Sequence, residues 1–166
     1  MIAQTTRAEL LAYLSELGIE TKTTDHPPLH TVDESRALRG DIPGSHTKNL
    51  FLKCKKNKLW LVVTLEDANV DLKILHRLIG SGRLSFGKPD LLIEALGVPP
   101  GSVTPFALIN DKSCRVNVVL DQTMMQRDPL NYHPLENNAT TTIGSEDLLT
   151  FIRATGHDPV ILSVAE

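Results

Sequence analysis

The sequence predicts one α/β domain over residues 1–166, with helices around a mixed, mostly antiparallel sheet. A length of 166 residues suits a single domain with a sizeable core. The content of 41% hydrophobic and 22% charged residues is ordinary for a globular protein. Helical and strand-like segments are mixed along the chain, without the regular strand–helix alternation that is typical of a doubly wound fold.

The N-terminal half is expected to hold two capped helices, a short strand and a hairpin. A capping box at residues 6–9 begins a helix that ends at Gly18, and the alternating segment 20–26 predicts a strand stopped by two prolines. A second capping box at residues 31–34 begins a short helix that ends near Gly40. Alternation then predicts two strands joined by a turn at residues 55–58. One strand places Leu50, Leu52 and Cys54 on one face, and the other places Leu59, Leu61, Val63 and Leu65 on one face.

The C-terminal half is expected to alternate between short helices and strands. Helices are predicted over residues 71–80, capped by Asp71, and over 88–97, with Pro89 in the first turn. A loop rich in proline and glycine follows, and two consecutive strands are predicted at 106–111 and 115–121. A helical turn at 122–128, a strand at 139–144, a helix at 145–156 capped by Ser145 and a strand at 159–165 complete the prediction.

Charge and cysteine usage exclude several classes of protein. The net charge of -3 gives no global attraction to nucleic acid, so an RNA partner would need a local basic patch. The two cysteines lack CxxC spacing, which argues for a reducing compartment and against a disulfide scaffold or zinc knuckle. The N-terminus lacks the pattern of a signal peptide, and no apolar run is long enough to cross a membrane. We therefore expect a cytoplasmic protein.

Familiar catalytic motifs are absent from the sequence. It contains no GxSxG, HExxH, Walker or GxGxxG motif. Two prolines separate His26 from His30, so both are interpreted as surface histidines, and we expect no metal site and no cofactor. Cys54 lies between lysines but alternates with Leu50 and Leu52, which favours a buried apolar role over a nucleophile.

Three separate segments carry weaker signals. Lys48 begins a mostly apolar strand, the loop from Gly101 to Pro105 has the form GxxxP, and His133 precedes a proline in "HPLENNATTTIG". Each segment has a plain structural interpretation, namely a solvated lysine, a connector, and a turn stabilised by its own asparagines. None of the three would identify a function by itself.

Taken together and in this order, the three segments resemble the YbaK and prolyl-tRNA-synthetase-associated domain family of trans-editing proteins. The likeness covers nearly the whole chain and is densest over residues 82–111 and 133–152. The form "TKNLFLK" is most similar to the freestanding branch that deacylates alanyl-tRNA carrying the proline anticodon. The resemblance implies a curved sheet surrounded by helices, and hydrolysis of the aminoacyl ester without a metal, a cofactor or a protein nucleophile.

The resemblance also implies which residues form the site. The backbone N–H groups of the loop that begins at Gly101, together with Ser102 and Pro105, would hold the substrate carbonyl. Lys48 would be the key side chain, and at an ordinary pKa near 10.4 it is protonated and a poor general base. His133 and Asn138 would complete the pocket, and the ribose 2′-hydroxyl of the substrate would orient the attacking water.

The partners and two alternative functions remain open at this point. The expected partner is tRNA of the proline isoacceptor, with prolyl-tRNA synthetase as a second candidate and no role for DNA or a membrane. Lys53, Lys55, Lys56 and Lys58 could contact phosphates, or simply solvate a hairpin tip, and residues 33–39 could form a lid. The substrate could instead be cysteinyl-tRNA or another small mischarged aminoacyl-tRNA. Alternatively, the chain could be a non-catalytic module that binds RNA or a nucleotide.

Overall fold

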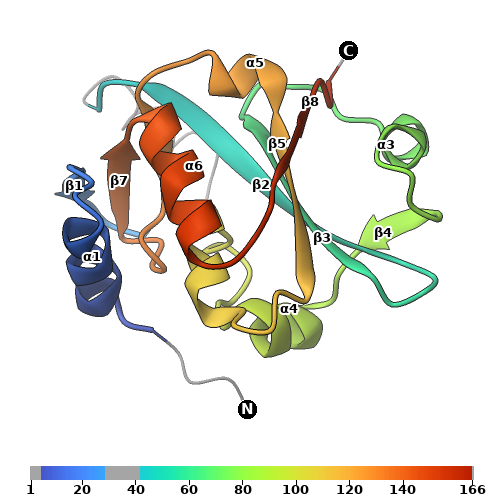
Figure 1. Ribbon diagram of the computed structural model, residues 1–166, viewed down its shortest axis with the longest axis horizontal. Coiled ribbons are helices and arrows are strands. Elements are labelled where there is room, and N and C mark those ends of the chain that lie inside the picture. Colours follow the sequence, from blue (N-terminus) through green and yellow to red (C-terminus); the bar gives the residue numbers. More distant parts are fainter. Residues whose placement is uncertain (1–4, 29–41, 166) are drawn as a thin grey trace.

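The computed structural model describes residues 5–28 and 42–165 and contains an open, mixed sheet with helices packed on it (Figure 1). In the described part of the chain the strands are β1 (Lys22–Asp25), β2 (Ser45–Cys54), β3 (Leu59–Leu65), β4 (Leu84–Phe86), β5 (Val116–Asp121), β6 (Leu130–Tyr132), β7 (Ala139–Ile143) and β8 (Val160–Leu162). The helices are α1 (Arg7–Glu16), α3 (Leu72–Leu78), α4 (Pro89–Leu96), the 3₁₀-helix η1 (Pro105–Asn110), α5 (Gln122–Met125) and α6 (Ser145–Ala154).

The sheet has the strand order β1-β7-β6-β2-β3-β5-β8, with β4 paired to β2. Antiparallel pairing joins β1 to β7, β7 to β6, and β2 to both β3 and β4. Parallel pairing joins β6 to β2, β3 to β5, and β5 to β8. The expected mixed and mostly antiparallel sheet is therefore confirmed. The order also places β1, near the N-terminus, beside β7, near the C-terminus (Figure 1).

The larger part of the core lies between one face of the sheet and α1, α4, η1 and α6. Phe106 of η1 and Phe151 of α6 are fully buried, and their rings meet edge to face with centroids 5.4 Å apart. Leu61 and Val63 of β3 belong to the same cluster. Burial of each such side chain stabilises the fold by about 1.5–3 kcal/mol, so this cluster fixes the position of η1 on the sheet.

A smaller cluster lies on the other face, under α3. It contains Leu52 and Cys54 of β2 together with Val62 of β3 and Leu75 of α3. The β2–β3 hairpin therefore has the two predicted apolar faces. Cys54 is 4% exposed and contributes to this cluster, as its alternation with leucines predicts.

Most helix boundaries follow from the local sequence. The Thr6–Glu9 capping box is present at α1, and the Asp71 side chain accepts a hydrogen bond from the N–H of Lys73 at the start of α3. Gly97 ends α4 with a left-handed backbone at φ 70°. The predicted helix near residues 31–40 lies outside the described residues.

Two local predictions are wrong. Residues 106–111 were expected to form a strand, but Pro105–Asn110 form η1, whose first N–H, that of Phe106, donates to the Thr104 hydroxyl. Pro105 lacks an N–H and suits the first turn of a helix, and a short apolar run fits a buried helix as well as a strand. Ser145 does not cap α6, because the cap residue is Gly144 and the N–H of Ser145 donates to the Asp128 carboxylate at 2.9 Å.

Within the described residues, no helix combines the length and the apolar composition that crossing a membrane requires.

Candidate functional site

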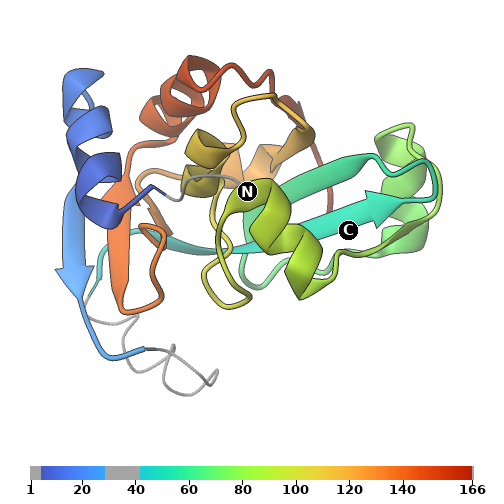
Figure 2. The same ribbon diagram turned by 90° about the horizontal axis from the view of Figure 1, so that it is seen from below.

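The α4–η1 loop, the β6–β7 loop and the end of β1 lie close together. Figure 2 shows the loop between α4 and η1 beside the loop that connects β6 to β7. The amide nitrogen of Asn137, in the β6–β7 loop, lies 3.9 Å from where a Cβ on Gly101 would be. The structure thus brings together the GxxxP loop and the segment that follows His133, which the resemblance placed in one site.

The GxxxP loop is held rigidly at both ends. Gly97 ends α4 on one side, and Pro105 begins η1 on the other. Inside the loop the N–H of Ser102 donates to the Pro99 carbonyl at 3.1 Å, and Gly101 has a left-handed φ of 92°. A glycine is favoured there because residues with a Cβ rarely adopt this conformation.

Only part of this loop offers free donors. The N–H of Ser102 is used within the loop, whereas no hydrogen bond from the N–H of Gly101, Val103 or Thr104 occurs among the described residues. Ser102 and Thr104 are buried, but Gly101 is exposed. A fixed, exposed backbone donor is suited to hold a carbonyl oxygen and to stabilise negative charge that develops on it.

His133 lies at the start of the β6–β7 loop and is partly buried. Its Nδ1 lies 3.1 Å from the Ala139 carbonyl oxygen, which can only accept, so Nδ1 carries the proton and Nε2 has the lone pair. Burial lowers the pKa of His133 below its ordinary value of 6.5, and the nearby His26 lowers it further, although the hydrogen bond to Ala139 acts in the opposite direction. The neutral ring at pH 7 therefore offers Nε2 as a hydrogen-bond acceptor.

His26 does not lie on the surface, as the sequence interpretation had it. Its side chain is buried, and its ring contacts the Pro27 carbonyl at 2.8 Å and the Thr140 hydroxyl at 2.9 Å. The reason is the pairing of β1 with β7, which joins residues more than a hundred positions apart and leaves no local signal in the sequence. His30 lies outside the described residues.

Asn138 and Asn137 have different surroundings. The exposed Asn138 side chain accepts a hydrogen bond at 3.2 Å from Arg7, which also pairs with Asp25 and Glu136. Asn138 is thus part of a polar network on the outer surface, whereas the amide of Asn137 is the one beside Gly101. The resemblance selected Asn138, whereas the amide beside Gly101 belongs to Asn137, because adjacent asparagines in a turn cannot be told apart by pattern alone.

Lys48 has a hydrogen-bond partner outside this group of residues. Its ammonium donates to the Ala68 carbonyl at 2.5 Å, and strand alternation places Lys48 on the sheet face of Leu50 and Leu52. Ala68 also lines a hollow of about 610 Å³, together with residues from β2, the end of β3, α5 and the C-terminal segment. No hydrogen bond between Lys48 and Gly101 or His133 occurs among the described residues.

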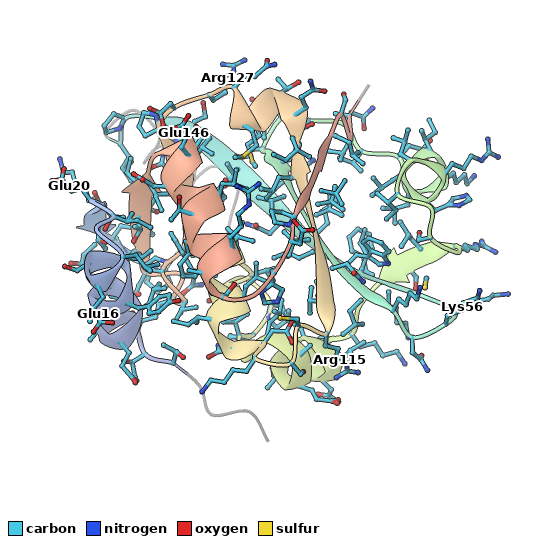
Figure 3. The ribbon with its side chains drawn as sticks, viewed as in Figure 1. Glu16, Glu20, Lys56, Arg115, Arg127 and Glu146 are labelled. Atoms are coloured by element: carbon cyan, nitrogen blue, oxygen red, sulfur yellow. The ribbon has the colours of Figure 1, made fainter. Side chains whose placement is uncertain are left out.

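The four-lysine group lies at the tip of the β2–β3 hairpin. Figure 3 shows Lys56 extending from this tip, on the side of the molecule opposite α1. Lys55, Lys56 and Lys58 are exposed and Lys53 is partly exposed. Arg83 lines a depression of about 350 Å³ with Lys53 and Lys55, which adds a fifth positive charge to this surface.

Among the described residues, no three His, Cys, Asp or Glu side chains lie close enough together to hold a metal ion.

Comparisons with known proteins agree on one family. Residues 26–151 match the model of the aminoacyl-tRNA editing domain. The chain is 40% identical over 162 residues to prolyl-tRNA synthetase associated domain-containing protein 1 of Mus musculus, covering 95% of both chains. It is 36% identical over 149 residues to the prolyl-tRNA editing protein ProX of Acetoanaerobium sticklandii, covering 89% of this chain and 91% of the relative.

The fold is shared with a solved structure of a proposed trans-editing enzyme for prolyl tRNA synthetase. The two chains superpose with a TM-score of 0.74 over 99% of each, at 20% sequence identity.

Proposed function

Since the chain belongs to the aminoacyl-tRNA editing domain family and is an aminoacyl-tRNA deacylase, we propose that its substrate is alanyl-tRNA(Pro), hydrolysed without a metal or a covalent intermediate. The observation that carries the proposal is the GxxxP loop, whose Gly101 is exposed and lies beside Asn137 of the β6–β7 loop. An aminoacyl ester is already activated, so positioning and fixed donors can supply much of the rate.

The GxxxP loop binds the ester carbonyl in this proposal. The N–H of Gly101 is exposed and fixed in direction by the turn from Pro99 to Ser102. As water adds to the carbonyl carbon, negative charge grows on the carbonyl oxygen, and this N–H stabilises it. Collapse of the intermediate breaks the bond to the ribose oxygen, which leaves with a proton and yields free alanine and tRNA.

In this proposal His133 accepts a hydrogen bond either from the substrate or from the attacking water. Its Nε2 carries the lone pair because Nδ1 donates to Ala139, and the lowered pKa keeps the ring neutral at pH 7. The ribose 2′-hydroxyl and the attacking water are the groups that can donate to it. The charged ammonium of Lys48 holds the terminal adenosine. To do so, the ammonium must give up its hydrogen bond to the Ala68 carbonyl when the substrate binds.

Selection against proline follows from size. A prolyl-activating site cannot strongly exclude a smaller amino acid, because missing methylenes change the free energy by only about 1–3 kcal/mol. A second site that admits alanine but is too small for proline can then hydrolyse the mischarged alanyl-tRNA. The tRNA is retained through phosphate contacts with the lysine group of the β2–β3 hairpin and Arg83.

The test is deacylation of a set of tRNAs charged with alanine, cysteine and proline. We expect fast hydrolysis of alanyl-tRNA(Pro) and protection of prolyl-tRNA(Pro). Faster hydrolysis of cysteinyl-tRNA(Pro) than of the alanyl form would replace the proposed substrate within the same reaction. Binding of tRNA without hydrolysis of any ester would favour the non-catalytic module.

A further inference from the structure

A single buried histidine holds both ends of a three-residue segment of the site. The backbone N–H of His26 donates to the carbonyl of Asn138 at 2.9 Å, and its ring nitrogen Nε2 lies 2.9 Å from the hydroxyl of Thr140. The residue between these two contacts is Ala139, which is fully buried at the start of β7. His26 therefore contacts the residue on each side of Ala139, through the backbone carbonyl of Asn138 and the side-chain hydroxyl of Thr140.

The polarity of the ring contacts can be assigned from chemistry. Nδ1 of His26 lies 2.8 Å from the Pro27 carbonyl, which can only accept, so this nitrogen carries the proton. In the neutral ring Nε2 then accepts a hydrogen bond from the Thr140 hydroxyl. Both ring nitrogens of His26 are used, and His26 has no nitrogen left for a substrate.

The segment held by His26 carries the group that orients His133. The carbonyl of Ala139 accepts the proton of His133 Nδ1 at 3.1 Å. Which nitrogen of a neutral histidine is protonated depends on the partner of the other nitrogen. If the Ala139 carbonyl were displaced, His133 could carry its proton on Nε2 instead of Nδ1. Nε2 would then no longer be able to accept a hydrogen bond from the substrate.

We propose that His26 is a positioning residue, which holds the Ala139 carbonyl against His133 and so keeps the Nε2 lone pair of His133 directed at the substrate. The proposal rests on the proposed role of His133 in deacylation. In this proposal His26, which lies outside the three sequence motifs, selects the Nδ1-protonated tautomer of His133.

Charged groups brace the same segment from outside. Arg7 of α1 bonds Asn138, Asp25 at the end of β1 and Glu136 in the loop, and the side chains of Asp25 and Glu136 are 77% and 48% exposed. These exposed charges are screened by solvent and salt. The hydrogen bond between His26 and Thr140 is buried, so it defines the position of this segment more strictly.

Two neighbouring threonines provide a matched pair of variants. Thr140→Val removes the hydroxyl that bonds His26 and keeps the shape of the side chain. Thr141→Val, one residue further on, removes a hydroxyl that pairs with Thr23 at 2.8 Å across the same two strands and does not contact His26. His26→Phe removes both ring hydrogen bonds, and Thr140→Val serves if that chain does not fold.

The measurements are the tautomer of His133, by ¹⁵N NMR of the full chain labelled on histidine, and single-turnover deacylation of alanyl-tRNA(Pro). In the wild-type chain we expect His133 protonated on Nδ1 at neutral pH. Thr140→Val should shift the His133 signals toward the Nε2-protonated form and lower the rate by about fivefold, the factor for one lost hydrogen bond. Thr141→Val should keep the wild-type signals and stay within about twofold in rate.

Two results would overturn the inference. One is a wild-type His133 that carries its proton on Nε2, and the other is an unchanged His133 spectrum in both Thr140→Val and His26→Phe. The NMR readout needs no substrate. If the tautomer shifts as expected while no aminoacyl-tRNA is hydrolysed, the positioning role stands and the proposed function fails.

Discussion

Gly101 has a conformational requirement that few other residues can meet. Its φ of 92° is left-handed, and the nearest atom to an added Cβ, the Asn137 amide nitrogen, would be 3.9 Å away. Backbone strain, and not crowding, is therefore what a side chain would cause. We expect Gly101→Val to turn the loop and lower single-turnover deacylation by about a hundredfold or more, which corresponds to about 2.7–4 kcal/mol for a lost oxyanion donor. Since Gly101 itself is exposed, a thermal melt should change little.

Ser102→Ala is the control for Gly101→Val. It keeps the backbone N–H that donates to Pro99 and removes only a hydroxyl. Its rate should stay within about tenfold of the wild-type rate. A fully active Gly101→Val would mean that the loop is a connector and that the carbonyl is held elsewhere.

Lys48 offers a second test on one side chain. Its contact with the Ala68 carbonyl leaves two further N–H donors for an anionic or polar substrate group. We expect Lys48→Ala to lower deacylation by about a hundredfold while the chain stays folded, because a fixed charge is lost from the site. Lys22→Ala, at an exposed lysine of β1 outside the proposed site, is the control. Near-normal activity in a folded Lys48→Ala would remove Lys48 from the site.

The junction of η1, β5 and α6 is held by a buried hydrogen-bond network around Asp111. The Asp111 carboxylate lies 2.8 Å from Nε2 of His157, and both side chains are 2% exposed. The same carboxylate accepts hydrogen bonds from the N–H groups of Arg115 and Val116. Asp111→Asn should lower the free energy of unfolding by about 3 kcal/mol at pH 7, because it leaves a buried network incomplete.

The effect of Asp111 should depend on pH in a defined direction. Burial raises the pKa of Asp111, but the hydrogen bonds from His157 and from the two N–H groups outweigh it and hold the pKa below 3.8. A carboxyl with a lowered pKa stabilises the fold above its ordinary pKa, and this contribution is lost as the pH falls through the folded value. In urea unfolding, the gap between wild type and Asp111→Asn should be constant near neutral pH and shrink below about pH 3.8. A gap that grows on acidification would contradict this account.

The β2–β3 hairpin can be tested as an RNA contact. Replacing Lys55 and Lys56 with Gln should weaken tRNA binding and reduce the slope of log affinity against log salt by about 1–2, since up to two phosphate contacts are lost. Replacing the exposed Lys22 and Lys112 removes the same charge at other places and serves as the control. Equal losses in both double variants would leave the hairpin with a purely solvating role.

The elements that were predicted correctly are those defined by neighbouring residues. The capping box of α1 and the alternation in β2 and β3 act over a few positions, so the sequence displays them directly. The run 106–109 was misassigned because a fully buried short helix has no polar face to reveal its period. The burial of His26 and the proximity of Asn137 to Gly101 could not be predicted for another reason, since Thr140 and Gly101 are distant from them in the sequence.

The whole chain offers a test of the metal-free reaction. Across the described residues no cluster of ligands is suited to a metal ion, and the sequence shows no ligand spacing either. If the proposed metal-free reaction holds, deacylation of alanyl-tRNA(Pro) is expected to be unchanged after dialysis against EDTA. Activity that disappears with EDTA and returns with zinc would replace the proposed mechanism by Lewis-acid catalysis.

The pairing of β1 with β7 also has a consequence for the order in which the chain folds. His26 can form its hydrogen bond with Thr140, 114 residues later, only after β7 has been synthesised and is free to pair with β1. Contacts of such high sequence separation form late, because loop closure must be overcome before they contribute. We therefore expect the pairing of β1 with β7, and with it the contact between His26 and Thr140, to form late in folding.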